Sequence, residues 1–303
     1  MVDLPTNPLS FLVLTLLAEQ PVAQATALYR HLTNFWSAID NVRVTHRGES
    51  IIQGSLIDLA VLNAALHGYT PHGTHLTGAA ANVAMSFILA LGRKPFWHEE
   101  GFPATSRGNL RFGFNVLDTT PGTATALQWA LEAVELIEDT PTQYLKYTTN
   151  SRALTATGRQ RVPLPMGNEI LGVLLFDPST EISTTETFAW GKIKVMKDNV
   201  EQYYVESNWE SLRADLARRI LRMHIAWGHL HGQAAVDTET GHEQIRGNEP
   251  PLQYGYLDFD PLDDGSYSLE TAGASDLELD LSSDVSTGTA RYMPIELVKL
   301  AGR

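Results

Sequence analysis

The sequence predicts an all-β fold made of two similar domains in tandem, each a β-sandwich or barrel, with the jelly roll among the candidates. Each half of the 303-residue chain contains roughly six to eight segments with the apolar alternation of strands. The connections between these segments are long, and the regular strand–helix alternation of a parallel α/β sheet is absent. In addition, a hairpin followed by a helix occurs twice, half a chain apart.

The repeated segment covers residues 42–66 in the first half and 193–216 in the second. Each copy begins with an alternating strand, turns at a small or turn-favouring residue (Gly48 or Asn199), and returns in a short apolar run. The offset between the copies is 151 residues from Val42 to Ile193, before the turn. Because hairpin-plus-helix is a common motif, coincidence is the alternative to duplication.

A capping box precedes the helix in both copies, as Ser55-x-x-Asp58 and as Ser207-x-x-Glu210. In this motif the hydroxyl accepts a hydrogen bond from an amide of the first turn, and the carboxylate reaches back to the cap amide. From Ser55 to Ser207 the offset is 152 residues, so the second copy has one extra turn residue. The pattern predicts that both helices occupy equivalent places in their domains.

The first half contains further strands, which we justify in chain order. Residues 10–19 are rich in strand formers, which is typical of a buried strand, and 109–116 alternate strictly. The short segment 144–149 is rich in strand formers, whereas 23–39 has helical spacing. Two segments fit either a strand or a helix, namely 82–91 and 127–138.

The boundary between the halves is expected inside the polar segment 150–161, which gives domains at 1–155 and 156–303. A buried strand is expected at 169–176, ended by Asp-Pro, and the second hairpin and helix follow it. The remaining predicted strands are 254–260, 277–281 and 291–300, with a turn at Asp263-Asp264-Gly265.

Composition excludes several classes of function. The absence of Cys rules out thiol catalysis, thiolate metal sites and disulfides, and the apolar run 8–18 is too short to span a bilayer. The formal net charge is −13, and no Lys or Arg lies between Asp258 and Asp284. Such a balance opposes direct binding to nucleic acid, and Gly158-Arg159-Gln160-Arg161 lacks the interleaved aromatic residues of a single-strand binder.

Histidines suggest a metal site, because two imidazoles on one strand face are typical of cupins. The sharpest group is His224, His229 and His231, followed by Glu239 and His242. However, Glu239 follows His231 by eight residues, which is too far for a cupin motif. A second group, His72 and His75 with Asn82, is similar to the other half of a cupin motif. It precedes the first group in the chain, whereas in a cupin it would follow. We therefore interpret these histidines as surface or loop residues.

An acidic group, Asp258, Asp260, Asp263 and Asp264, could hold Ca²⁺ through hard oxygen ligands, but its order does not match an EF-hand. A solvated acidic turn is the better interpretation. The sequence contains no Gly-x-Ser-x-Gly elbow, phosphate-binding loop or dinucleotide fingerprint. We therefore assign no catalytic, cofactor-binding or metal-binding residue, and expect a structural or binding role without a cofactor.

The layout resembles the major capsid proteins of tailless, membrane-containing icosahedral bacteriophages, those of the corticovirus and finnlakevirus type in particular. The resemblance covers nearly the whole chain. In the first half it rests on FLVLTLLAE, LYRHLTNFWSAI and VRVTHRGESIIQGSLIDL, and in the second on LPMG, EILGVLLF and YGYLDFDPLDDGSYSLETAGASDLELDL.

The resemblance implies two jelly-roll β-barrels in tandem (a double jelly roll), each with a short helix after its early hairpin, standing perpendicular to a capsid surface. It implies a homotrimer that forms a pseudo-hexagonal capsomer and contacts neighbouring capsomers, minor capsid or penton proteins and an internal membrane. The protein would then be a component of the virion, assembled in the host cytoplasm, and no enzyme. The alternative is a cellular jelly-roll protein that binds carbohydrate or, like a cupin, a metal.

Three connections are longer than joining strands requires, namely residues 68–78, 94–106 and 232–251. Long ordered loops usually have a use. We expect at least one of them to lie in a contact between subunits and the others on a particle surface.

Overall fold

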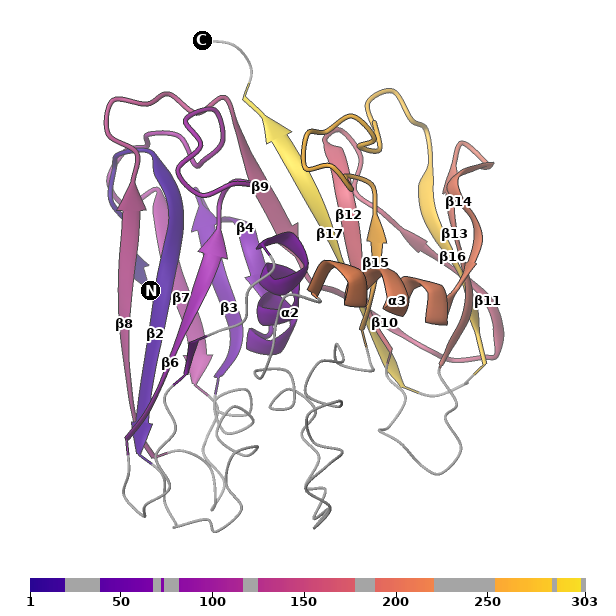
Figure 1. The fold of residues 1–303 in the computed structure, drawn as a ribbon, viewed down its shortest axis with the longest axis horizontal. Helices are drawn as coiled ribbons and strands as arrows, with labels where there is room; N and C mark the ends of the chain where they lie inside the picture. Colours follow the sequence, from indigo (N-terminus) through magenta and orange to yellow (C-terminus); the bar gives the residue numbers. More distant parts are fainter. Residues whose placement is uncertain are drawn as a thin grey trace. The chain divides into compact units, whose positions relative to one another are not determined.

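The computed structural model describes residues 1–19, 39–67, 72–73, 82–116, 125–177, 189–220, 254–284 and 288–300. Within them the chain forms two compact units, both dominated by antiparallel strands (Figure 1). The first unit contains the described residues of Met1–Leu145 and Arg219–Pro251, and the second contains those of Lys146–Arg218 and Leu252–Ala301. No helix in this part of the chain is long and apolar enough to cross a membrane.

The first unit has two sheets and one helix. In one sheet the strand order is β1-β7-β3-β4, with β1 Val2–Asp3, β7 Leu110–Val116, β3 Ile39–His46 and β4 Glu49–Gly54. In the other the order is β5-β6-β2-β8, with β5 His72–Gly73, β6 Asn82–Ala90, β2 Leu9–Glu19 and β8 Thr125–Glu135. The helix α2 (Leu56–His67) follows β4, and the division between the units falls within β9 (Gln143–Thr148).

The second unit repeats this arrangement. One sheet has the order β11-β16-β13-β14, with β11 Gly158–Pro163, β16 Leu277–Ser283, β13 Trp190–Lys197 and β14 Val200–Asn208. In the other, β10 pairs with β17, which is followed by β12 and β15; the bounds are β10 Asn150–Ala153, β17 Thr289–Lys299, β12 Glu169–Phe176 and β15 Tyr254–Asp258. The helix α3 (Trp209–Ile220) follows β14.

The strand orders confirm the duplication predicted from the sequence. The order β1-β7-β3-β4 of the first unit corresponds to β11-β16-β13-β14 of the second, and β6-β2-β8 corresponds to β15-β12-β17. Corresponding strands also follow one another in the same order along the chain. Seven described strands of each unit therefore correspond, and in both units two antiparallel sheets enclose one core, as in a jelly roll.

Each core lies between the two sheets of its unit. In the second unit, buried side chains of β12 such as Val173 belong to the same apolar cluster as Val195 of β13 and Leu279 of β16. In the first unit, Trp129 of β8 contacts Phe112 and Phe114 of β7, with ring centroids 6.1 and 5.4 Å apart. Inward-facing residues thus alternate with outward-facing ones along the strands, as the period of two predicted.

The two hairpins turn in the same way, each through two residues, so the prediction of an extra turn residue in the second copy is wrong. Arg47 and Gly48 have φ of 53° and 89°, and Asp198 and Asn199 have φ of 53° and 62°. Two successive residues with positive φ are typical of type I′ hairpin turns, whose twist suits the flanking strands. Glycine and Asn adopt this region most readily, which is why the sequence placed turns at Gly48 and Asn199.

The helices occupy equivalent positions. Helix α2 packs against β6, where the Asn63 side-chain amide donates to the carbonyl of Ile88. Helix α3 packs against β15, the counterpart of β6. The ring of Trp209 lies so close to Gly255 of β15 that a Cβ added there would be 2.8 Å from Cζ3 of Trp209. Gly255 thus makes room for the indole, and each helix covers the corresponding strand of its own unit.

Most predicted elements are confirmed, and the two ambiguous segments, 82–91 and 127–138, contain β6 and β8. The predicted cap of the second helix is wrong. Ser207 lies in β14, opposite Ile193 of β13, and α3 begins only at Trp209. Asn208 therefore occupies the N-cap position, because pairing with β13 extends the strand by one residue beyond the expected cap. The predicted helix at 23–39 lies outside the described residues, apart from Ile39, which begins β3.

Candidate functional site

The histidines considered as metal ligands lie mostly beyond the described part of the chain. This holds for His224, His229, His231, Glu239 and His242, and also for His75. His72 is in β5, where its backbone pairs with Ser86 of β6, and Asn82 begins β6. Within the described ranges, no three His, Asp or Glu side chains are grouped so that they could hold a metal ion.

The acidic group after β15 forms a turn stabilised by its own carboxylates. The backbone amides of Asp264 and Gly265 donate to Oδ1 of Asp260 at 3.1 and 2.7 Å, and the amide of Asp260 donates to Oδ1 of Asp258 at 3.0 Å. Oδ1 of Asp264 accepts from the amide of Ser266 at 2.8 Å. The carboxylates therefore serve as acceptors for turn amides, as Asx turns require.

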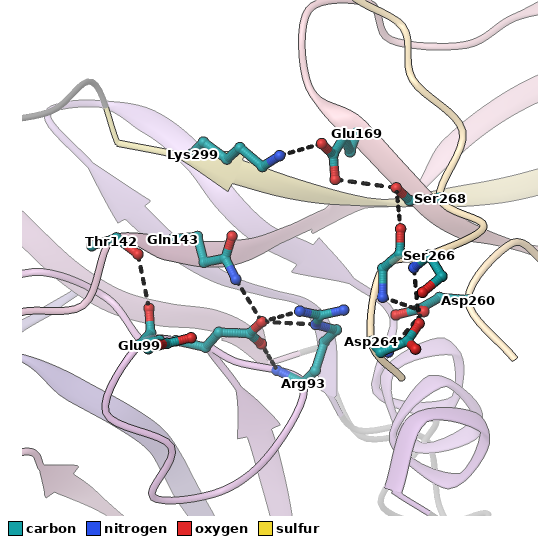
Figure 2. A network of polar contacts seen from close by, with 12 residues as sticks. Arg93, Glu99, Thr142, Gln143, Glu169, Asp260, Asp264, Ser266, Ser268 and Lys299 are labelled. Atoms are coloured by element: carbon teal, nitrogen blue, oxygen red, sulfur yellow. Dashed lines mark hydrogen bonds and ion pairs between the residues drawn. The ribbon is translucent and has the colours of Figure 1, made fainter. Parts of the chain in front are cut away.

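A second set of contacts joins this turn to the beginning of β12 and the end of β17. Figure 2 shows Glu169 between Lys299 and Ser268; the Ser268 hydroxyl lies 3.1 Å from Oε2 of Glu169, and Lys299 pairs with Oε1. Oγ of Ser268 also donates to the carbonyl of Gly265 at 3.0 Å. The whole connection between β15 and β16 is thereby ordered, and it presents the exposed side chains of Leu262 and Tyr267.

The equivalent connection of the first unit, between β6 and β7, is ordered by a buried ion pair. Arg93 Nε donates to Oε1 of Glu100 at 2.8 Å, and the Arg93 amide donates to Oε2 at 2.8 Å. Gln143 Nε2 also donates to Oε1 at 2.8 Å (Figure 2). Glu100 is fully buried. A buried pair with most of its oxygens and N–H groups satisfied fixes one loop conformation, because breaking it leaves a charge without compensation.

This loop presents an aromatic residue to solvent. Phe96 is 66% exposed and has φ of 61°, which is unusual for a bulky residue. Its amide donates to Oγ of Ser10 at 2.8 Å, and its ring meets Phe11 edge to face at 5.4 Å. Lys94 Nζ lies 4.8 Å from the ring centroid of Trp97. An exposed aromatic ring on a fixed backbone is typical of interface anchors.

The outer face of the sheet β11-β16-β13-β14 is charged, and its charges are paired. Arg159 of β11 lies 3.4 Å from Asp280 and 3.6 Å from Glu206, and Lys192 lies 3.3 Å from Glu206. The hydrogen bond from Lys192 and the positive charges of Lys192, Lys194 and Arg159 lower the pKa of Glu206. Arg161 lies 3.3 Å from Glu278. The basic residues of Gly158–Arg161 therefore belong to a ladder of ion pairs.

Two histidines of the first unit are shifted towards their neutral form. Burial lowers the pKa of His67, at the end of α2, to about 4. Burial, together with the charge of Arg47, lowers the pKa of His46, and Glu49 opposes this effect. His46 Nε2 lies 3.4 Å from the Thr105 hydroxyl. Both lowered pKa values favour the neutral imidazole near pH 7.

The ordering residues of the two loops were not found from the sequence. Gln143 begins β9, 43 residues after Glu100, and Glu169 is 130 residues from Lys299 in the chain. No local spacing therefore indicates either contact. The Pro-Phe-Trp run at 95–97 was recognised only as part of a loop. Its exposed ring follows from the fold, which places Ser10 beneath the amide of Phe96.

Comparison with known proteins gives no match to any family model and none to a curated protein sequence. Solved structures do match over almost the entire chain. The major capsid protein of bacteriophage PM2 is 13% identical with a TM-score of 0.60, covering 99% of this chain and 91% of that one. The major capsid protein of Sulfolobus turreted icosahedral virus (STIV) is 11% identical with a TM-score of 0.61, covering 98% and 91%.

The capsid of PBCV-1 virus also matches, with 8% identity and a TM-score of 0.50, over 97% of this chain and 87% of that chain. These solved structures are viral capsid proteins, so they lend no support to the alternative of a cellular carbohydrate-binding or cupin-like protein. With equivalent strand orders in both units and this likeness along the whole chain, the protein has the double jelly-roll fold.

Proposed function

We propose that this protein is the major capsid protein of a tailless icosahedral virus. The observation that carries the proposal is the internal equivalence of the two units, together with end-to-end structural likeness to viral major capsid proteins. A fold likeness at 11–13% identity establishes architecture, and the step from architecture to a coat function is ours.

The proposed assembly is a homotrimer. Three subunits that each contribute two similar barrels supply six similar positions around one axis, which is what a pseudo-hexagonal tile needs. The contact is heterologous and closes after three copies. We expect it to bury on the order of 2,000 Å² or more per subunit pair, as obligate interfaces do.

The proposal also covers the barrels and the other partners. Residues 1–155 and 156–303 would form the two barrels, since β11, which corresponds to β1, begins at Gly158. The strand β10 precedes this boundary in the chain but pairs with β17 of the second barrel. The capsomers would contact one another, minor capsid or penton proteins and an internal membrane, after assembly in the host cytoplasm. The protein would act without catalysis, cofactor or direct contact with nucleic acid.

Of the three long connections expected at contacts or on the surface, 94–106 is described throughout. It is the connection that the buried pair of Arg93 and Glu100 orders and on which Phe96 is exposed. Ordering a loop before association reduces the entropy lost on binding. We therefore place this loop in a contact between subunits, while 232–251 and most of 68–78 lie outside the described residues.

The test is the mass of the purified protein in solution, followed by electron microscopy of the same sample. Light scattering should give three times 33.4 kDa, and class averages should show six barrels around the trimer axis. A monomer that persists at high micromolar concentration and never forms a ring would refute the capsomer.

A further inference from the structure

The edge strand β8 of the first unit differs from its counterpart in the second unit. In the second unit, β10 pairs antiparallel with β17, with Asn150 opposite Tyr292 and Ala153 opposite Thr289. In the first unit, β8 pairs with β2 on one side, and none of the described strands pairs with its other side. Figure 1 shows β8 as the outermost strand of its sheet.

This difference is visible in the exposure of the two strands. Ala290 and Tyr292 of β17, which lie opposite Arg152 and Asn150 of β10, are buried. In β8, Trp129 belongs to the inward row, because it lies opposite the buried Leu16, yet it is 43% exposed. An apolar side chain of the inner row stays exposed when no strand lies beyond it, and among the described strands β8 is the last one on this side of the sheet.

The edge itself is suited to pairing. β8 has 11 residues, and its register with β2 is continuous from Gln128 to Val134. Natural proteins protect open edges with Pro, Lys, bulges or short strands. Between Gln128 and Val134, β8 contains neither Pro nor Lys, and Glu132 is its single charge.

Charge indicates the kind of strand that would fit. Acidic residues of β8 and of the turn after it are Glu132, Glu135, Glu138 and Asp139, and no Lys or Arg occurs from Thr125 to Leu145. Opposite charges on neighbouring strands stabilise a sheet, and like charges destabilise it. A basic strand is therefore favoured at this edge over an acidic one.

We propose that the open edge of β8 binds an extended, basic segment of another polypeptide by β-augmentation, which supplies the first unit with the strand that β10 supplies to the second. Main-chain hydrogen bonds to β8 provide most of the affinity, and the side chains alternate between a position beside Trp129 and the outer face near Glu132. The proposal concerns the first unit alone and does not depend on the oligomeric state.

The probe is an acetylated and amidated octapeptide, Thr-Lys-Val-Thr-Val-Lys-Val-Thr, added to the purified protein. Hydrogen–deuterium exchange with residue-resolved fragmentation should show that every second amide of β8 is slowed by the peptide. The amides of β17 from Thr289 to Tyr292 should not change, because β10 already pairs with that part of the edge. Fast exchange of alternate β8 amides in the protein alone is the expected starting point.

Three controls separate backbone pairing from charge and from adsorption. Methylating alternate peptide nitrogens removes the donors of one edge and should abolish protection, while exchanging Lys for Glu in the peptide should weaken binding. In the protein, Glu132→Lys should weaken binding by about three- to tenfold. Glu210→Lys, the same charge change on the exposed face of α3, should have no effect.

Three outcomes would overturn the proposal. One is slow exchange of all β8 amides without peptide, because the edge is then already covered. The second is protection that survives N-methylation, which is adsorption through side chains. The third is a lack of any change at β8 at millimolar peptide.

Discussion

Trp209 is fully buried at the first position of α3, where its indole faces Gly255 and belongs to the core of the second unit. Trp209→Ala should lower the free energy of unfolding by roughly 3–5 kcal/mol, because it removes a large buried side chain and leaves a cavity. Urea denaturation followed by circular dichroism measures this loss. Trp129→Ala, in the exposed edge strand β8, is the matched control and should cost clearly less. Equal losses for the two variants would contradict the burial argument.

Glu100 accepts hydrogen bonds from Arg93 and Gln143 in the interior of the first unit. Glu100→Gln keeps the shape but leaves the buried guanidinium without its charge partner, which should cost roughly 3–5 kcal/mol of stability. The comparison is Glu278→Gln, whose partner Arg161 is largely exposed. That change should cost less than about 1 kcal/mol. If thermal unfolding shows the same loss of stability for Glu100→Gln and Glu278→Gln, the loop does not depend on the buried pair.

His67 gives the first unit a predicted dependence on pH. Burial lowers its pKa to about 4 in the folded protein, against an ordinary value of 6.5. Between these values the unfolded chain binds more protons, so the contribution of His67 to stability is complete above pH 6.5 and is lost as the pH falls towards 4. His67→Gln should therefore flatten the curve of unfolding free energy between pH 6.5 and 4. His98→Gln, at an exposed position, should leave this pH dependence unchanged. If the unfolding free energy still falls steeply with pH in both variants, groups other than His67 cause the pH dependence.

The two helix caps should respond differently to substitution. The amide of Asp58 donates to the Ser55 hydroxyl at 3.2 Å, so Ser55→Ala should cost about 1 kcal/mol. Ser207 lies in β14, and Asn208 occupies the N-cap position of α3. Asn208→Ala should therefore cost about 1 kcal/mol, and Ser207→Ala clearly less. Chemical denaturation of the three variants measures these losses of stability. If Ser207→Ala costs more than Asn208→Ala, Ser207 is the N-cap, as expected from the sequence.

Periodicity located the strands because one face of nearly every strand is buried. It could not decide 127–138, since a helix and a strand both place Leu127, Leu131 and Val134 plausibly. The decision comes from pairing with β2, which lies more than 100 residues earlier in the chain. The same limit explains the cap of α3: the capping box at Ser207 is a local signal, and pairing of Lys192 with Asn208 overrides it.

The candidate functional residues were less accessible to sequence reasoning than the fold. The acidic group at Asp258–Asp264 was visible as a turn, but which oxygens accept which amides depends on backbone geometry. The pair of Arg93 and Glu100 has no recognisable spacing, and the partner Gln143 is in β9, distant in the sequence. Sequence patterns report burial and local turns, whereas contacts between loops appear only after the strands have brought those loops to one end of a unit.

Across the whole chain, the duplication relates these two polar networks to each other. The connection between β6 and β7 and that between β15 and β16 are topologically equivalent, and each is ordered by buried carboxylates that accept backbone amides. The residues differ, since Glu100 serves in one and Asp260 in the other. What the two units share is therefore a fixed loop at the same end of the barrel, achieved by different hydrogen bonds, and each loop exposes a large apolar side chain.

The proposed subunit contact at 94–106 can be tested by separating assembly from stability. Phe96 is exposed and has positive φ, so Phe96→Gly removes the ring and also relieves the backbone strain. Because the lost contact with Phe11 and the relieved strain oppose each other, the unfolding free energy of the subunit should change by less than about 1 kcal/mol. Removing an aromatic anchor from an interface should nevertheless raise the dissociation constant of the trimer about tenfold or more.

Val116→Gly is the matched control, because Val116 is also an exposed apolar residue but ends β7 outside this loop. Analytical ultracentrifugation over a range of concentrations compares trimer formation by the two variants, and electron microscopy compares their particles. If Phe96→Gly forms trimers and particles as readily as Val116→Gly, then the loop decorates the particle and the subunits meet along the barrel walls. If it dissociates while the subunit keeps its unfolding free energy, the pair of Arg93 and Glu100 orders the loop for assembly.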